Sequence, residues 1–455
     1  MNYPLWVVPY LGGSWVIGII SIIHIFISHF AVGGGIFLAL AEQMAYTRKD
    51  ERIYDFLKQH SRFFVLVTTV AGAVTGVGIW FSVSLVSPDG LASLIQSFTL
   101  AWAEEYLFFA AELATAFAYY YTWDRISREQ HLLLARLYMA FSIFTLVIIN
   151  GILTFMLTPG KWLTSHYWFD GVFNATYFPS LVIRLLIMVA IAGMYALVTS
   201  SRIKEPKFRA FMVRYCAKWL LPVFLLGPIA MIWFLSQIPN AAVTTIFTGI
   251  QASGVGNFSI LARALYLSMV LSGTVLLFAF FGPFLNPKAF TFRIAMLFMV
   301  CGLAVTGTTE WMREMLRKPY VVYNYIYSNG IHKADIDEIT RDGFLHKGKW
   351  ASAMAKSAHS DTERGELVFR GECMACHTTT GYRSMKKLLG TRDEEAIGNF
   401  LSMLKETDPK RNNYSGIMPP LAANDEEVKN LATYLSTINE NERNEATKLG
   451  ALPAK

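Results

Sequence analysis

Eight stretches of almost uninterrupted apolar residues dominate the first two thirds of the sequence and constrain its fold more than any other feature. They lie near residues 14–41, 64–86, 99–122, 137–157, 176–199, 218–236, 260–284 and 292–311. A helix needs about 20 apolar residues to cross a hydrocarbon core about 30 Å thick. Only 16% of the residues are charged, against about 25% in soluble domains. The sequence therefore predicts an all-α fold built on an eight-helix transmembrane bundle.

The positive charges are unevenly distributed among the loops between these stretches. Lys and Arg gather after the first, third, fifth and seventh stretches, and the alternate loops hold Lys161 alone. Basic loops stay on the cytoplasmic side, so we expect the N-terminus and residues from 312 onward on the outer face. In a bacterium this means the inner (cytoplasmic) membrane, with both parts on the periplasmic side. The net charge of +7 then reflects topology, and no nucleic-acid partner is expected.

A short cysteine motif marks the polar C-terminal part of the chain. Cys373-Met-Ala-Cys376-His377 has the c-type haem attachment pattern, in which two thiols form thioethers and the histidine binds the iron. The other two cysteines lie inside apolar stretches, so no disulfide framework is expected. A zinc or redox Cys-x-x-Cys site is the alternative interpretation.

The surroundings of the motif resemble the class I cytochrome c family over residues 360–440. Gly365-Glu-Leu-Val-Phe precedes the motif, Met418-Pro-Pro follows it, and an amphipathic segment ends the region. The resemblance implies one covalent haem c, with His377 and Met418 as its axial ligands, and Gly365 packed against Tyr434. It also implies attachment of the haem outside the bacterial membrane, which agrees with the topology from the loop charges.

Histidines and carboxylates inside spanning helices are costly and indicate function. The first stretch carries His24 and His29, which lie about 140° apart around a helix and so should not share one metal. Gly33-Gly-Gly, just beyond them, allows close approach of a flat cofactor or another helix. The third stretch carries glutamates, which indicate protonated carboxyls, a haem ligand or a proton path. They are Glu104, Glu105 and Glu112. A packing role for either histidine, and a hydrated helix end for the first two glutamates, stay open.

Three further charged positions lie in later stretches. Arg184 falls about 12 Å into the fifth predicted helix at 1.5 Å per residue. It needs an anion there, either a haem propionate or a carboxylate, unless it extends to the outer surface. Glu310 and Glu314 lie at the outer end of the last stretch, where a salt-bridged turn is the alternative to a role beside a haem.

These motifs together resemble subunit I of the cytochrome bd quinol oxidases over most of residues 10–320. The matching positions are His24 with the later Glu42, Glu104 and Glu112 ahead of Trp123-Asp-Arg, Glu310 ahead of Glu314-Met-Leu-Arg-Lys-Pro-Tyr, and Met269-Val-Leu-Ser-Gly. The resemblance implies two closely placed membrane haems of b and/or d type. It implies His24 and Glu310 as iron ligands, Glu104 near the haems, Glu112 as the proton donor, and a second membrane subunit of bd type as partner.

The chain departs from this family at two places. The family histidine that pairs with Met269 falls on Arg184, so the low-spin haem b is either absent or held differently. The long quinol-binding loop is missing, because about 23 residues separate the sixth and seventh stretches. We therefore expect haem c to replace the quinol-side haem as the point where electrons enter.

The resemblance and the motifs predict a respiratory oxidoreductase of the lipid bilayer. Electrons from a periplasmic cytochrome or a quinol would pass through haem c to membrane haems that reduce O2 or another small diatomic such as NO. The alternative is an electron-transfer subunit that links the quinol pool to periplasmic cytochromes without O2 reduction.

The expected organisation is an eight-helix bundle followed by a small helical class I cytochrome c domain. We assign residues 1–320 to the bundle, 321–360 to a connector and 361–455 to the cytochrome c domain. Six histidines are expected to be surface residues: His60, His131, His166, His332, His346 and His359.

Overall fold

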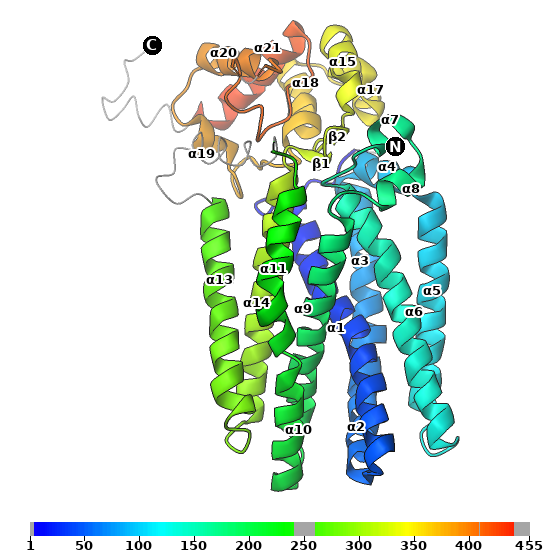
Figure 1. The fold of residues 1–455 in the computed structure, drawn as a ribbon. Coiled ribbons are helices and arrows are strands. Elements are labelled where there is room, and N and C mark those ends of the chain that lie inside the picture. Colours follow the sequence, from blue (N-terminus) through cyan, green and yellow to red (C-terminus); the bar gives the residue numbers. More distant parts are fainter. Residues whose placement is uncertain (1–3, 241–259, 409, 441–455) are drawn as a thin grey trace.

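The computed structural model describes residues 4–240, 260–408 and 410–440. Long helices run side by side in one bundle, and a smaller, mostly helical part lies at one end of it (Figure 1). The N-terminal end of the chain lies at this same end of the bundle. The short loop expected between the sixth and seventh stretches falls largely outside the described residues.

Eight long helical segments coincide with the eight predicted stretches. They are α1 (Gly13–Arg48), the run of α2 (Glu51–Val65), η1 (Leu66–Ala71) and α3 (Gly72–Val86), α5 (Thr99–Tyr121), α6 (Arg128–Phe155), α9 (Tyr177–Ser200), the pair α10 (Pro206–Lys218) and α11 (Leu221–Gln237), the pair α13 (Ile260–Ala279) and η2 (Phe280–Phe284), and α14 (Phe292–Arg317). Within the described residues, seven are long and apolar enough to span a membrane. The remaining one, α5, carries three glutamates in 23 residues. The predicted all-α bundle is confirmed.

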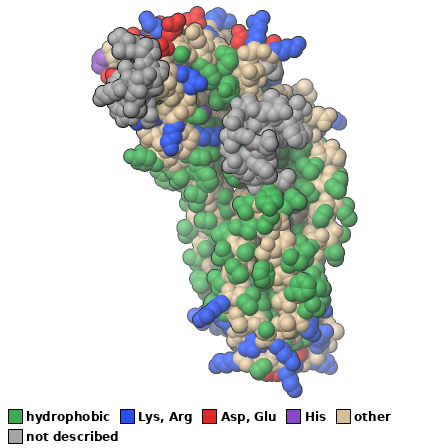
Figure 2. Space-filling model, turned by 90° about the vertical axis from the view of Figure 1, so that its left-hand side faces the viewer, with side chains coloured by type: hydrophobic (Ala, Val, Ile, Leu, Met, Phe, Trp, Pro, Cys, Tyr) green, Lys and Arg blue, Asp and Glu red, His purple; other side chains and the backbone are tan. Residues whose placement is uncertain are grey.

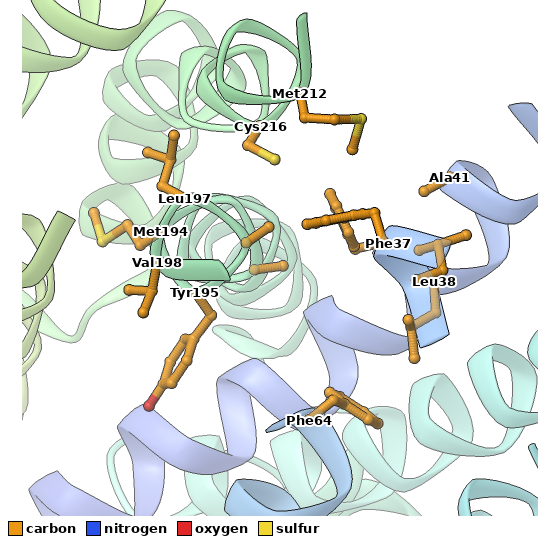
Figure 3. Packing of buried hydrophobic residues seen from close by; sticks show 14 of the residues in the cluster. Phe37, Leu38, Ala41, Phe64, Met194, Tyr195, Leu197, Val198, Met212 and Cys216 are labelled. Carbon is orange, nitrogen blue, oxygen red and sulfur yellow. The ribbon is translucent and has the colours of Figure 1, made fainter. Parts of the chain in front are cut away.

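Helix α1 packs against α3, α6, α9 and α14. Its glycines allow this close packing, because a Cβ on Gly33 would lie 2.0 Å from the Met188 carbonyl oxygen of α9. A Cβ on Gly35 would lie 2.5 Å from the Tyr138 ring of α6. Figure 3 shows buried side chains of α1, α9 and α10 that face one another, among them Phe37 and Cys216. The glycine run therefore accommodates neighbouring helices.

Three short helices lie in the loops between the long helices, at the end of the bundle next to the smaller part. They are α4 (Pro88–Ser97), α7 (Trp162–Ser165) and α8 (Trp168–Val172). The smaller part contains β1 (Tyr320–Val322), β2 (Ile326–Tyr327), η3 (Lys333–Asp335), α15 (Ile336–Asp342), α16 (Phe344–Lys347), α17 (Lys349–Ala355), α18 (Asp361–Val368), η4 (Phe369–Cys373), α19 (Met385–Leu389), α20 (Glu394–Leu404) and α21 (Asp425–Ile438). Strands β1 and β2 pair antiparallel.

The core of the smaller part is formed around the contact between α18 and α21. A Cβ on Gly365 would lie 2.0 Å from the Asn430 carbonyl oxygen and 2.8 Å from Cβ of Tyr434. Only a glycine lets the two helices approach this closely. The predicted contact between Gly365 and Tyr434 is therefore confirmed.

The segment before α18 shares this core. Buried apolar side chains between Tyr327 and Ala351 and between Leu367 and Leu435 belong to one cluster. In addition, Glu427 of α21 accepts hydrogen bonds from the backbone N–H groups of Phe344 (2.8 Å) and Leu345 (2.6 Å). The predicted connector is thus packed as part of the smaller unit.

Two histidines that were expected on the surface are buried. His60 and His131 are 0% and 2% exposed, so the expectation is wrong for both. The helix α2 begins at Glu51 and α6 at Arg128, earlier than the apolar stretches. The third turn of α2 therefore carries His60 into the bundle core, and the first turn of α6 carries His131 there.

The surface of the bundle changes character along its length. Apolar side chains cover its middle, and Lys and Arg gather at the end away from the smaller part (Figure 2). Such an apolar belt between two polar ends is the surface that a lipid bilayer requires.

Candidate functional site

Residues 373–383, which begin at the last residue of η4, form the haem attachment loop. Cys373 and Cys376 are free thiols. His377 Nδ1 lies 3.1 Å from the Arg383 carbonyl oxygen, which only accepts, so Nδ1 carries the proton. Burial lowers the pKa of His377, which keeps the ring neutral and leaves an electron pair on Nε2. Two free thiols beside an imidazole oriented in this way fit a covalent haem c with His377 as iron ligand.

The expected second ligand lies in a turn after α20. The Met418 N–H donates to the Tyr414 carbonyl oxygen at 2.8 Å, and Asn412 is buried at the start of this turn, where its side chain donates to the Glu406 carbonyl oxygen at 2.9 Å. These bonds fix the backbone ahead of the two prolines. The role of Met418 as axial ligand stays a prediction.

A buried carboxyl group lies next to the attachment loop. Glu372 is 8% exposed, and Asn329 Nδ2 donates to its Oε2 at 2.8 Å. Its Oε1 has no hydrogen-bond partner among the described residues. Burial raises the pKa of Glu372 well above its ordinary value, which favours the neutral acid. Glu372 thereby joins the segment that follows β2 to the attachment loop.

The attachment loop rests directly on the start of α1. The Tyr382 N–H donates to the Tyr10 carbonyl oxygen at 2.6 Å, and Ser14 Oγ donates to the carbonyl oxygen of Ala375, inside the cysteine motif. The rings of Trp15 and Tyr382 meet edge to face, with centroids 5.6 Å apart. Helix α1 therefore begins in contact with the haem attachment loop.

Residues that follow β2 and α14 lie near the same loop. Ser328 Oγ lies 3.7 Å from Cys376 Sγ, and Lys318 is close enough to Cys376 to interact with it electrostatically. Glu314 pairs with Lys318 at 3.1 Å and also with Arg317. The salt-bridged turn considered for Glu314 is therefore present.

Within the bundle, His24 of α1 is oriented by α3. Its Nδ1 lies 3.1 Å from Thr75 Oγ1, whose own proton goes to the Ala71 carbonyl oxygen at 2.7 Å. His24 Nδ1 must therefore be the donor, and Nε2 keeps an electron pair. A Cβ on Gly76 would lie 3.2 Å from His24 Cε1, so the glycine lets the ring lie close against α3. This arrangement fits an axial haem ligand.

A charged cluster lies close to His24. His29 of α1, Arg184 of α9, and Glu310 with Arg313 of α14 are within electrostatic range of one another. Glu310 Oε2 accepts a hydrogen bond from Arg313 Nε at 2.8 Å, and Arg184 Nε approaches Ser180 Oγ at 3.4 Å. Three helices thus bring together a carboxylate, two guanidinium groups and an imidazole. His29 therefore belongs to this cluster, which its position in the sequence did not predict.

The carboxylates of α5 differ in their surroundings. Glu112 is 7% exposed and accepts a hydrogen bond from Tyr138 Oη of α6 at 2.9 Å. Glu105 is half-buried, and Glu104 is exposed on the outside of the helix. Of the three, Glu112 is the carboxyl that the structure encloses.

A second buried carboxyl lies further from the smaller part. Glu42 of α1 is fully buried and lies 2.7 Å from His131 Nδ1, whose Nε2 is bonded to the Tyr119 carbonyl oxygen at 3.0 Å. A carbonyl only accepts, so Nε2 carries a proton. The start of α6 lies upstream of the apolar stretch, and for that reason sequence patterning missed this pair.

Arg184 and Met269 stand at the positions that hold the low-spin haem b in the bd family, and their surroundings do not fit that haem. Met269 of α13 is 66% exposed. Arg184 is buried and its guanidinium group has only donors, so it cannot supply an electron pair to iron. We therefore assign no haem to the pair of Arg184 and Met269.

The fold and these sites define a multi-pass membrane protein that binds haem for electron transfer. Residues 362–439 match the cytochrome c family model, so the smaller part contains a cytochrome c domain. The fold of the chain is similar to the structure of bd oxidase from Geobacillus thermodenitrificans, with a TM-score of 0.55 and 14% sequence identity. The match covers 80% of this chain and 94% of the other. No curated protein matches the sequence.

Proposed function

We propose that this protein is a respiratory oxidase of the bd type, which takes electrons through a covalent haem c and reduces O2 or another small diatomic such as NO at haems of b and/or d type inside the bundle. The contact of the attachment loop with α1 carries the proposal. Ser14, which bonds to the loop, and His24 lie ten residues apart on one helix, or about 15 Å at 1.5 Å per residue.

Different residues are proposed to hold haem c and the membrane haems. When bound, haem c supplies one-electron transfer, and a membrane haem with an open iron position supplies the site of reduction. Cys373, Cys376 and His377 would hold haem c, with Met418 as the second axial ligand of its iron. His24 would hold one membrane haem, and Glu310 is the proposed ligand of the other.

Protons and propionates have candidate partners in the same bundle. Glu112 is buried and hydrogen-bonded to Tyr138, so it can hold a proton at Oε1 or Oε2 and release it inside the bundle without admitting bulk water. Arg184 and Arg313 place two positive charges beside Glu310. Either guanidinium group would pair well with a haem propionate, because such pairs form charge-assisted hydrogen bonds.

The proposal extends to location and partners. The cytochrome c domain and the N-terminal segment lie at one end of the bundle, and the basic loops lie at the other, which supports a periplasmic position for the domain in a bacterial inner membrane. The donor is then a periplasmic cytochrome or a quinol. A second membrane subunit of bd type is the proposed partner.

Binding of CO to the reduced protein tests the enzyme proposal. An open iron in the bundle should shift the Soret band of a non-covalent haem, and the purified protein should consume O2 with an artificial donor. The M418A variant is the matched control, because it also opens the haem c iron and should add a CO shift of the c-type band to that of the non-covalent haem. A fully six-coordinate wild-type spectrum, together with quinol oxidation but no O2 uptake, would favour the electron-transfer subunit.

A further inference from the structure

A basic cavity lies at the end of the bundle opposite the cytochrome c domain. It has a volume of about 720 Å³ and lies between the end of α1, helix α10 and the turn that precedes α14. Five of its lining side chains are positive and none is negative: Arg48, Lys207, Arg214, Lys218 and Lys288. None of the five forms a salt bridge with the part of the chain that the structure describes. The cavity therefore concentrates positive charge that no salt bridge within the described chain pairs.

Two of the guanidinium groups are held in place around this cavity. Arg214 Nε donates to the Phe284 carbonyl oxygen at 3.0 Å, which leaves its terminal N–H groups available. The guanidinium of Arg48 lies over the Phe211 ring, 5.4 Å from the centroid. An arginine that is already oriented loses less conformational freedom when it binds a phosphate through two parallel hydrogen bonds.

Most of the remaining lining is apolar, and apolar side chains continue from it toward the middle of the bundle. Met44, Phe211 and Leu285 line the cavity, and Leu285 is 50% exposed. Phe281, one turn earlier in η2, is also exposed. Figure 2 shows the apolar belt beginning above the basic end. A ligand with an anionic head and an apolar tail meets both kinds of surface here.

We infer that this cavity binds the headgroup of an anionic phospholipid from the surrounding bilayer. The phosphate lies among the arginines and lysines, and the acyl chains extend along Leu285 and Phe281 into the belt. Basic pockets between spanning helices bind anionic lipid heads in this manner. Free inorganic phosphate shares the head chemistry, but it would leave the apolar lining without a partner.

Native mass spectrometry of the full-length holoprotein, released from detergent, tests this inference. We expect a retained adduct with phosphatidylglycerol and none with phosphatidylcholine at the same concentration. Each basic residue beside an anionic lipid contributes about fivefold in affinity. The variant R214Q/K218Q should therefore bind phosphatidylglycerol about 30-fold more weakly than the wild type.

The control variant R62Q/R125Q removes two exposed positive charges at the same end of the bundle, outside the cavity. It should bind phosphatidylglycerol within about twofold of the wild type, because long-range attraction falls off within a Debye length. An equal loss in both variants would overturn the site, as would phosphatidylcholine that binds equally well. Displacement of the lipid by equimolar inorganic phosphate would assign the cavity to phosphate instead. If R214Q/K218Q does not fold, K207Q/K288Q gives the same test with two exposed lysines.

Discussion

Substitution of Gly381 by alanine should separate the haem attachment loop from the start of α1. A Cβ at this position would lie 1.9 Å from the Tyr10 carbonyl oxygen and 2.1 Å from Tyr10 Cα, and backbone atoms cannot yield as a flexible side chain can. Tyr10 has a φ of 63°, which is uncommon for a residue other than glycine. The tight contact with Gly381 therefore leaves this part of the chain little room to adjust.

The magnitude follows from the contacts that would be lost. They are the hydrogen bond from the Tyr382 N–H, the hydrogen bond from Ser14 to Ala375, and the edge-to-face pair of Trp15 and Tyr382. At about 1 kcal/mol for each hydrogen bond and about 1 kcal/mol for the aromatic pair, the sum is about 3 kcal/mol. This corresponds to about a 150-fold shift of the docking equilibrium.

Hydrogen exchange at the Tyr382 amide measures this shift, because that N–H donates to Tyr10 in the docked state. Protection of this amide should fall about 150-fold in G381A, with haem c content unchanged. The control is G398A, where a Cβ would lie 3.9 Å from Cβ of Ala432 in ordinary contact, and its protection should match the wild type. Wild-type protection in a folded G381A would refute the reasoning.

Three further substitutions test the proposed ligands and the packing of the cytochrome c unit. H24A should lose one membrane haem and keep the haem c band, and an unchanged non-covalent haem content in the pyridine haemochrome spectrum would contradict it. M418A should lower the haem c potential and slow the passage of electrons into the bundle, whereas an unaltered redox titration would assign the sixth position to another group. E427A leaves the buried N–H groups of Phe344 and Leu345 without their acceptor. It should destabilise the cytochrome c unit by about 2–4 kcal/mol in denaturant unfolding followed by the haem c absorbance, and an unchanged midpoint would show that water replaces the carboxylate.

The positions of the spanning helices along the chain could be predicted from the sequence, because a bilayer leaves the backbone few alternatives to a helix. The contact between Gly365 and Tyr434 was also predictable, since the family resemblance supplied both partners. In contrast, the glycine run from Gly33 allowed two interpretations, a cofactor or a neighbouring helix. Only the packing against α6 and α9 distinguishes them.

The pairing of side chains between helices could not be predicted. The apolar pattern places the end of a helix where hydrophobicity ends, but α6 begins at Arg128, and its first polar turn carries His131 to Glu42. Similarly, the cluster of His29, Arg184 and Glu310 depends on how three helices are rotated against one another. Loop charges fix the direction of a helix and leave its rotation undetermined.

The contact between the attachment loop and α1 has a kinetic consequence. A cytochrome on a flexible tether reaches its acceptor by a diffusional search, whose rate depends on the length and stiffness of the tether. Here residues 10–15 and Ser328, which follows β2, contact the loop, and Lys318 at the end of α14 lies within electrostatic range of Cys376. The domain is therefore already docked on the bundle. On the proposed route, internal electron transfer should be insensitive to solvent viscosity, and the only slow encounter is with the external donor.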